Sequence, residues 1–531
     1  MKRRNFIKNA AAGVVLPSLF GQYNVEAVGL SPWMQALTNT ATETDHVLVI
    51  IRLSGGNDSL QMVIPLDQYS NLSTARSNIL INESQVLKLN GVTATGFHPA
   101  MSGMQTLFNE GKLKVIQGVG YPNQNFSHFR STDIYMSASN AAENIITGWA
   151  GRYLSNEYAN YPTGYPNTQV PDPLAIQLNE MTLTFQGVAQ TMGVTVSDPS
   201  NPYAFLADNG NALTGKVGKE LTYLREIAQQ ADKYGAIIKT AYGKATNLVT
   251  YPTANAANGN NASLANQLKI VARLIKGGLK TRVYMVTIGG FDTHSNQVTS
   301  ADHSVGNYAT LMTQLSESIT AFQRDLEAMR IQDRVLGMTF SEFGRRVKSN
   351  GSFGTDHGAA YSSFVFGTRL FGGVLGVSPT INANATVNDN VAMQYDFRSI
   401  YSSILADWFC VSTTDLNTIM LRNFQKLPIV NSPGCITDTH DLNVAAGLKL
   451  ISNYPNPFSF ATTIDFETKG GHTMVQIFDV EGQLIATPVD GEYVEGKYKV
   501  YYNGGHLPAG VYYARLQNEA ISQVRTMMKV Q

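Results

Sequence analysis

The fold is decided by the stretch HVLVIIRLSGGND at residues 46–58. The run from Val47 to Ile51 is apolar without interruption, which is typical of a strand buried on both faces of a sheet. Small and polar residues follow at once, from Ser54 to Asp58. The stretch therefore predicts a central strand whose carboxyl end opens into a polar loop.

Three later segments repeat this order of apolar run and polar loop. In each of them, ionisable or hydroxyl side chains follow the expected strand. Since the carboxyl ends of parallel strands meet at one edge of a sheet, we expect these loops to converge there. The three segments are 112–119 followed by 121–133, 283–288 followed by 289–294, and 335–340 followed by 341–346.

Apolar residues at three-or-four spacing predict helices between the strands, at about residues 221–238 and 308–329. Strands that alternate with helices favour an α/β fold, a mostly parallel sheet with helices on both faces, here over residues 45–430. Asn, Ala and Gly interrupt the segment from about 208 to 280, and we expect it to form a helical insertion that caps the domain.

The composition excludes two classes of function. The 531 residues carry 39 Lys+Arg and 39 Asp+Glu, so the basic excess that nucleic-acid binding requires is missing. No apolar run reaches the roughly 18 to 20 residues that cross a bilayer, so we expect no transmembrane anchor. The length suffices for one large catalytic-size domain and a smaller one.

Residues 1–27 predict a signal peptide, because the basic run KRRNFIK at residues 2–8 precedes a short apolar stretch and the small-residue pattern at 25–27. The arginine pair resembles a twin-arginine signal, which implies export of a folded chain; an ordinary secretory signal is the alternative. Cys410 and Cys435 are the only cysteines, too few for a disulfide framework but compatible with one bridge in an oxidising compartment.

Residues 449–531 predict a second, all-β domain after a linker at 431–448. Apolar and polar residues alternate in short segments separated by turn sequences, the pattern of a small antiparallel sandwich. The motifs of this segment are NYPNPF at 453–458, FDVEGQ at 478–483 and LPAGVYY at 507–513.

These motifs closely resemble the C-terminal sorting domain of the type IX secretion system found in Bacteroidetes. The resemblance implies that export machinery carries the protein through the periplasm and across the outer membrane, to a secreted or cell-surface location. A carbohydrate-binding or adhesive sandwich is the alternative interpretation.

Three pairs of aspartate and histidine in loops of the central domain indicate metal binding. Mixed oxygen and nitrogen ligands suit zinc, manganese or iron, whereas calcium and magnesium use mainly the oxygens. Any one pair also occurs as a turn or a helix cap, so the set of three carries the prediction. The pairs are Asp292 with His294, Asp302 with His303, and Asp356 with His357.

The central domain contains six short motifs, SGGNDS at 54–59, QGVGYPN at 117–123, SHFRS at 127–131, GFDTH at 290–294, TFSEFGRR at 339–346 and TDHG at 355–358. Together they resemble the bacterial domain of unknown function 1501 family, and the resemblance covers nearly the whole domain. That family is grouped by distant similarity with the alkaline-phosphatase-like superfamily of phosphatases, sulfatases and phosphoglycerate mutases. The resemblance implies that superfamily's fold, from which an activity does not follow.

Members of the superfamily place an aspartate after the first strand and a nucleophile at a helix start. By this resemblance Asp58, or its neighbour Asn57, takes the first place as a metal ligand. Ser127 is the first choice for the nucleophile and His128 is a second catalytic candidate, because Arg130 follows closely enough to bind an anionic ester oxygen. The alternative role of Ser127 is to cap the helix.

The superfamily's later metal ligands match less regularly. Asp292 and His294 take the place of one pair, with the spacing Asp-x-His instead of Asp-x-x-x-His, and His303 is the candidate for the missing ligand. Glu342 stands where the superfamily has an aspartate, either as a ligand or as the partner of Arg345.

Asp356 and His357 match an Asp-His-Gly string of the mutases, although they lie a loop away from the preceding strand. The main hypothesis is therefore an exported, metal-dependent hydrolase of phosphate or sulfate esters. A non-catalytic surface module that binds a glycan or a protein on the same fold is the alternative. A nucleotide cofactor is not indicated, since SGGN at 54–57 lacks the Lys-Ser/Thr of a phosphate-binding loop. His98 is expected at a helix start.

Overall fold

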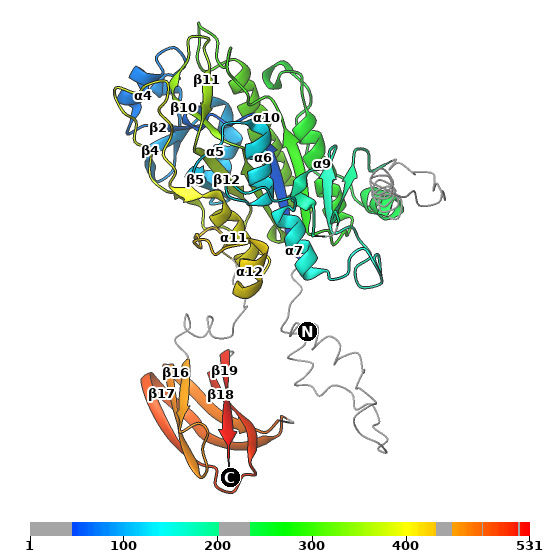
Figure 1. Cartoon of the computed structure of the whole chain (residues 1–531), viewed down its shortest axis with the longest axis vertical. Helices are drawn as coiled ribbons and strands as arrows, with labels where there is room; N and C mark the ends of the chain where they lie inside the picture. The colour runs from blue at the N-terminus through cyan, green and yellow to red at the C-terminus, as the bar shows by residue number, and fades with distance from the viewer. Residues whose placement is uncertain are drawn as a thin grey trace. The chain divides into compact units, whose positions relative to one another are not determined.

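The structure, a computed structural model, describes residues 45–188, 190–200, 234–431, 449–480, 482–518 and 521–530. The chain divides into two compact units, one from Asp45 to Cys435 and one that contains the C-terminal strands. Figure 1 shows the helices and strands of both units. The predicted signal peptide and residues 432–448 of the predicted linker lie outside the described residues.

The large unit is built on a nine-stranded sheet that is almost entirely parallel. In the order β13-β5-β12-β9-β1-β8-β6-β7, with β14 also paired to β5, β12 is antiparallel to its neighbours β5 and β9, and the other pairs are parallel. The strands are β1 (Val47–Leu53), β5 (Leu113–Gly120), β6 (Ala175–Leu178), β7 (Gly193–Val196), β8 (Val283–Ile288), β9 (Val335–Phe340), β12 (Tyr361–Phe366), β13 (Gly373–Leu375) and β14 (Tyr395–Asp396).

Strand β1 lies near the middle of this sheet, as its apolar run predicts. Successive side chains of a strand point to opposite faces, so an uninterrupted apolar run needs a core on each face. Val47, Val49 and Ile51 contribute to one core, and Leu48 and Ile50 to the other. The α/β fold class with helices on both faces is confirmed.

Helices α5 (Ser102–Asn109), α9 (Ser263–Lys276) and α10 (Asn307–Ala328) share the first core. Helices α6 (His128–Ser137), α7 (Trp149–Glu157), α11 (Phe397–Asp407) and α12 (Thr413–Ile419) share the second. The helix expected at 308–329 is α10. Helix α9 lies in the segment expected to form an inserted cap, yet it packs on the sheet, so this part belongs to the helical cover. Residues 208–233 of that segment lie outside the described residues.

Smaller elements stand beside the sheet. Strands β2 (Val63–Pro65), β4 (Val92–Phe97) and β3 (Leu87–Leu89) form a three-stranded sheet, and β10 (Gly344–Ser349) pairs with β11 (Thr355–Gly358) as an antiparallel hairpin. Helices α3 (Ser59–Met62) and α4 (Tyr69–Ala75) follow β1 along the chain.

The C-terminal unit is a five-stranded antiparallel sheet with its own core. Its strands are β15 (Lys449–Tyr454), β16 (Ala461–Phe478), β17 (Leu484–Asn503), β18 (Gly510–Asn518) and β19 (Ile521–Lys529). The all-β class is confirmed, but a single sheet replaces the two expected sheets.

Two glycines explain how one sheet builds a core like that of a sandwich. The first part of β16 pairs with β15 and the last part with β18, and Gly470 and Gly471 lie between them with φ of +99° and +85°. Glycine adopts such backbone angles at no steric cost. Residues from both parts of β16, among them Phe466 and Val475, share one core.

Two further expectations concern the whole chain. Among the described residues, no helix combines the length and the apolar character that spanning a membrane requires. Cys410 takes part in a disulfide bond, and Cys435, the other cysteine of the chain, lies outside the described residues.

Candidate metal centre

The loops that follow three parallel strands meet at the carboxyl edge of the large sheet, as the direction of these strands requires. Strand β5 leads to His128 at the start of α6, β8 leads to Asp292 and His294, and β9 leads to Glu342. The β10–β11 hairpin brings His357 to the same place. The convergence predicted from the sequence is therefore observed for these five residues.

Three histidines surround the carboxylate of Asp292. Its Oδ1 lies 3.2 Å from Nε2 of His294 and 3.3 Å from Nε2 of His357, and its Oδ2 lies 3.5 Å from Nε2 of His128. The Nε2 atoms of His294 and His357 are 2.9 Å apart. Ligand atoms of His128, Asp292 and His357 all lie within 4.8 Å of one another.

The second nitrogen of each ring faces a hydrogen-bond acceptor. Nδ1 of His128 is 3.0 Å from Oε1 of Glu342, and Nδ1 of His294 is 3.0 Å from Oδ1 of Asp356. Nδ1 of His357 is 2.8 Å from the carbonyl oxygen of Phe126. A carbonyl or an ionised carboxylate only accepts, so Nδ1 of each ring donates, and in the neutral ring the lone pair lies on Nε2.

Three lone pairs and a carboxylate thus point at one another, an arrangement that fits a divalent metal ion. Zinc binds four nitrogen and oxygen ligands at about 2.0–2.2 Å in a tetrahedron, and its histidine ligands usually donate their other N–H to a carboxylate or a carbonyl. Each Nε2 atom lies 3.2 to 3.5 Å from a carboxylate oxygen of Asp292, a spacing that suits ligands of one ion, and the ligand atoms of His128, Asp292 and His357 form a mutually close set. The donor set and its hydrogen-bonded outer partners both fit.

Arg345 holds the aspartate of this cluster in place. Its buried guanidinium donates to Oδ1 of Asp292 at 2.7 Å and to the carbonyl oxygens of Phe291 at 2.9 Å, Thr355 at 2.9 Å and Gly56 at 2.8 Å. A further hydrogen bond reaches the carbonyl of Gly55. One side chain therefore ties together the loops that follow β1 and β8 and the β10–β11 hairpin.

Burial and the charge of Arg345 set the ionisation of the cluster. Burial raises the pKa of Asp292, but the hydrogen bond and charge of Arg345, together with His294 and His357, outweigh it, and that pKa lies below its usual value. Burial lowers the pKa of His357 and the charge of Arg345 lowers it further, against the hydrogen bond to Phe126. An ionised carboxylate and a neutral imidazole are the forms that bind metals.

Glu342 orients His128 rather than pairing with Arg345. It is 1% exposed, and its Oε1 accepts from the backbone N–H of Gly55 at 2.8 Å as well as facing Nδ1 of His128. Its other oxygen, Oε2, has no hydrogen-bond partner among the described residues. Asp356 plays the equivalent part beside His294, where Asn350 also donates to it at 3.1 Å.

Ser127 and Arg130 both belong to the start of α6, but they face different surroundings. Ser127 occupies the N-cap position, is exposed, and its hydroxyl makes no capping hydrogen bond. Arg130 donates to the carbonyl oxygens of Asn140, Ala141 and Glu143, so its guanidinium holds the loop after α6. The expected contact of Arg130 with an ester oxygen is therefore replaced by a structural one.

Asp58 and His303 do not join the cluster. Asp58 is 1% exposed, and Nη1 of Arg76 donates to both of its oxygens, at 2.9 and 2.7 Å, while Gln297 donates to Oδ2 at 2.6 Å. Nδ1 of His303 lies 2.9 Å from the carbonyl oxygen of Leu80, at a separate pocket.

The comparisons with known proteins agree with the division into two units. Residues 452–530 match the secretion system C-terminal sorting domain, which indicates export to a secreted or cell-surface location. No curated protein shows significant sequence similarity to the chain.

Solved structures that resemble the chain have low sequence identity to it. The lipoteichoic acid synthase LtaP from Listeria monocytogenes is 8% identical, with 74% of this chain and 76% of that chain covered and a TM-score of 0.30. A protein in the alkaline phosphatase superfamily from Vibrio parahaemolyticus is 8% identical, with 93% and 84% covered and a TM-score of 0.32. The PsFucS1 sulfatase from Pseudoalteromonas sp. is 10% identical, with 88% and 85% covered and a TM-score of 0.31.

The large unit matches a different family model from the C-terminal unit. Residues 48–407 match the family described as protein of unknown function DUF1501. This span includes most of β1 at one end, all of α11 at the other, and every residue of the histidine cluster. Since the match covers more than half of the 531 residues, the chain belongs to the DUF1501 family.

Proposed function

We propose that this protein is an exported, metal-dependent hydrolase of phosphate or sulfate esters. The observation that carries the proposal is the convergence of three Nε2 lone pairs on the carboxylate of Asp292, at 3.2 to 3.5 Å. In this proposal His128, His294, His357 and Asp292 hold the ion. The nitrogen-rich donor set favours zinc or manganese over calcium or magnesium.

A divalent ion bound there supplies a Lewis acid that offsets negative charge on the ester. The protein supplies the arrangement of the ligands: Arg345 fixes Asp292, and Glu342 and Asp356 fix the rings of His128 and His294. Because these supporting side chains are hydrogen-bonded to their partners, the cluster needs little rearrangement to bind its ion.

Ser127 is the proposed nucleophile. Its hydroxyl is exposed and unused in capping, and it immediately precedes His128 of the cluster. The Ser127 oxygen forms a bond to the phosphorus or sulfur atom while the bond from that atom to the ester oxygen breaks. The serine proton passes to solvent, and the departing ester oxygen takes a proton from solvent and leaves as an alcohol. Water then breaks the new bond, which releases phosphate or sulfate and restores the hydroxyl. The backbone N–H groups at the start of α6 stabilise the negatively charged phosphate or sulfate group during both steps.

Metal content and turnover test the proposal together. The mature protein is analysed for metals and assayed with aryl phosphate and aryl sulfate esters. We expect about one equivalent of zinc or manganese per chain, with turnover of one ester class. The double variant Asp292→Ala, His294→Ala should lose both the metal and the turnover, whereas His472→Ala, a histidine of the C-terminal unit, should lose neither. Metal-free protein without turnover would favour the non-catalytic binding module.

Ser127→Ala tests the nucleophile separately. We expect unchanged metal content and a fall in kcat of at least a hundredfold, because the attacking group is gone. Ser102→Ala, which removes an exposed hydroxyl from α5, is the matched control. If Ser127→Ala keeps its turnover, the assignment of the serine is wrong and the metal assignment stands.

A further inference from the structure

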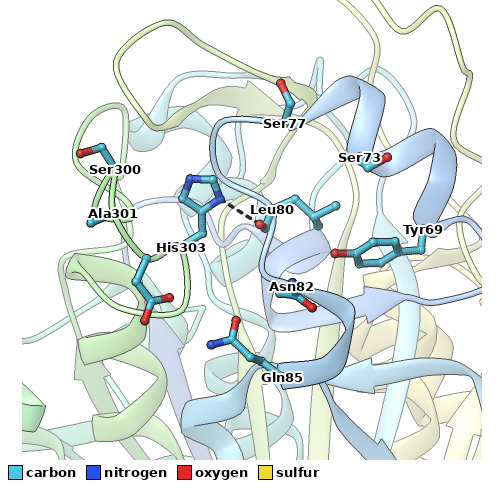
Figure 2. A pocket seen from close by; sticks show the side chains of 10 residues that line it. Tyr69, Ser73, Ser77, Leu80, Asn82, Gln85, Ser300, Ala301 and His303 are labelled. Carbon is cyan, nitrogen blue, oxygen red and sulfur yellow. Dashed lines mark hydrogen bonds between the residues drawn. The ribbon is translucent and has the colours of Figure 1, made fainter.

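A second site candidate is the pocket that His303 lines. It has a volume of about 510 Å³ and lies between α4 with the following segment to Gln85, on one side, and the loop at residues 300–303, on the other. Figure 2 shows the side chains that line the pocket, with His303 on one side turned toward Leu80 on the other. Small-molecule sites typically enclose about 300–1,000 Å³, so the size is adequate for a ligand.

The lining of this pocket is polar and carries almost no apolar side chains. Leu80 and Ala301 are its apolar residues, and the others carry hydroxyl, amide, carboxylate or imidazole groups. No lysine or arginine lines it. A lining of this kind does not suit an apolar ligand, and it offers no permanent cation to an anionic one.

Several of these polar groups remain available to a ligand. The hydroxyls of Ser77 and Ser300 have no hydrogen-bond partner among the described residues. Oδ1 of Asn82 accepts from the backbone of Ser84, which leaves its amide N–H groups to donate. His303 uses Nδ1 toward Leu80, and its Nε2 points elsewhere with a lone pair. The pocket therefore offers donors and acceptors side by side.

Buried contacts fix the walls of the pocket. Gln61, which is buried, donates to the carbonyl of Ile79 at 3.1 Å and reaches the carbonyl of His303 at 3.5 Å. The hydroxyl of Tyr69 donates to the carbonyl of Ile81 at 2.7 Å. The hydrogen bond between His303 and Leu80, dashed in Figure 2, joins the two sides directly. A ligand thus meets a preformed surface, which lowers the entropy cost of binding.

We propose that this pocket binds a neutral carbohydrate. A sugar ring presents hydroxyls that both donate and accept, which matches the mixed groups of Ser77, Ser300, Asn82 and His303. The carboxylate of Asp302 accepts from neutral hydroxyls and repels anions, so the site prefers neutral sugars to acidic ones. This inference concerns a site apart from the histidine cluster and does not depend on ester hydrolysis.

Calorimetric titration of the full chain with neutral sugars tests the proposal. The probes are glucose, galactose, mannose, maltose, cellobiose and lactose, with glucuronate as the acidic counterpart of glucose. We expect saturable binding of at least one neutral sugar and weaker binding of glucuronate. Sugar binding should persist after treatment with a chelator, so the outcome of this titration does not depend on whether the histidine cluster binds a metal.

The double variant Ser77→Val, Ser300→Val assigns the binding to this pocket. It replaces two unpartnered hydroxyls by methyl groups, and we expect affinity to fall about tenfold or more. Ser197→Val, at an exposed serine outside the pocket, should bind as the wild type does. If the double variant does not fold, the single variant Ser300→Leu takes its place, because its larger side chain would obstruct the pocket and should lower the affinity in the same way. Absence of saturable binding to every probe, or equal affinity of the pocket variants, overturns the proposal.

Discussion

His294 and His357 face each other through their Nε2 atoms at 2.9 Å, while the Nδ1 atom of each ring is held by another acceptor. Two neutral rings in these tautomers repel each other, and an ion between them removes the repulsion. We therefore expect added Zn²⁺ to raise the melting temperature of metal-depleted protein, since a ligand at 100 times its Kd stabilises by about 2.7 kcal/mol. His357→Asn should abolish the rise, whereas His472→Asn should retain it. An equal rise in both variants in scanning calorimetry would place the ion elsewhere.

Variants of Asp58 and His294 should show that stability and metal binding depend on different residues. Asp58→Asn leaves the buried charge of Arg76 without its carboxylate, and breaking a buried pair costs about 3–5 kcal/mol. His294 is partly exposed, so His294→Gln should change the free energy of unfolding by less than about 1 kcal/mol. Urea unfolding and metal analysis on the same samples should show opposite effects, with metal retained in Asp58→Asn and lost in His294→Gln. Metal loss in a folded Asp58→Asn variant would return Asp58 to the ligand set.

Gly55 is expected to tolerate no side chain. Its φ is +127°, and a Cβ atom there would lie 2.3 Å from the backbone nitrogen of Asp292. Gly55→Ala should therefore destabilise the protein by about 3 kcal/mol or more and displace Asp292, with reduced metal content. Gly91 has φ of +73° but open space around it, so Gly91→Ala should cost only about 1 kcal/mol and leave the metal in place. Equal losses of stability in the two variants would show that the positive backbone angle alone, and not the nearby backbone of Asp292, causes the destabilisation.

His98 should make the protein sensitive to mild acid. Burial lowers its pKa to about 4, and its Nδ1 accepts from the N–H of Ala100 at the start of a short 3-10 helix, η2 (Pro99–Met101). Between pH 6.5 and about 4 the unfolded chain binds a proton at His98 that the folded chain does not, so stability falls as the pH falls, by roughly 3 kcal/mol in total. His98→Asn keeps a capping acceptor without this titration. Its unfolding free energy, measured in urea from pH 7 to pH 4, should decline less steeply than that of the wild type.

The sheet could be predicted from the sequence because each central strand is recognisable from its own residues, without knowing which strands it pairs with. A strand buried on both faces is apolar along most of its length, and β1 and β8 show this directly in residues 47–51 and 283–286. The positions of Asp292 and His294 after the end of β8 followed from the same rule. The start of a helix at His98 also agrees with its capping role in η2.

The direction of single side chains could not be predicted in this way. Asp58 also follows a strand, but its partner Arg76 is 18 residues further along the chain, and no local pattern connects them. Arg130 lies in the expected helix, yet its guanidinium turns to the loop after that helix. The role of the Phe126 carbonyl beside His357 belongs to the backbone and leaves no trace in residue type.

The pair Gly470-Gly471 has a consequence for the sorting domain as a whole. One strand, β16, provides hydrogen-bonding edges to both ends of that domain, so neither end has a complete ladder without it. Loss of the last ten residues would remove Met527 from the shared core and strip β18 of β19. Shortened versions of this unit are therefore expected to lose its core, and with the core the folded surface that an export machinery would recognise.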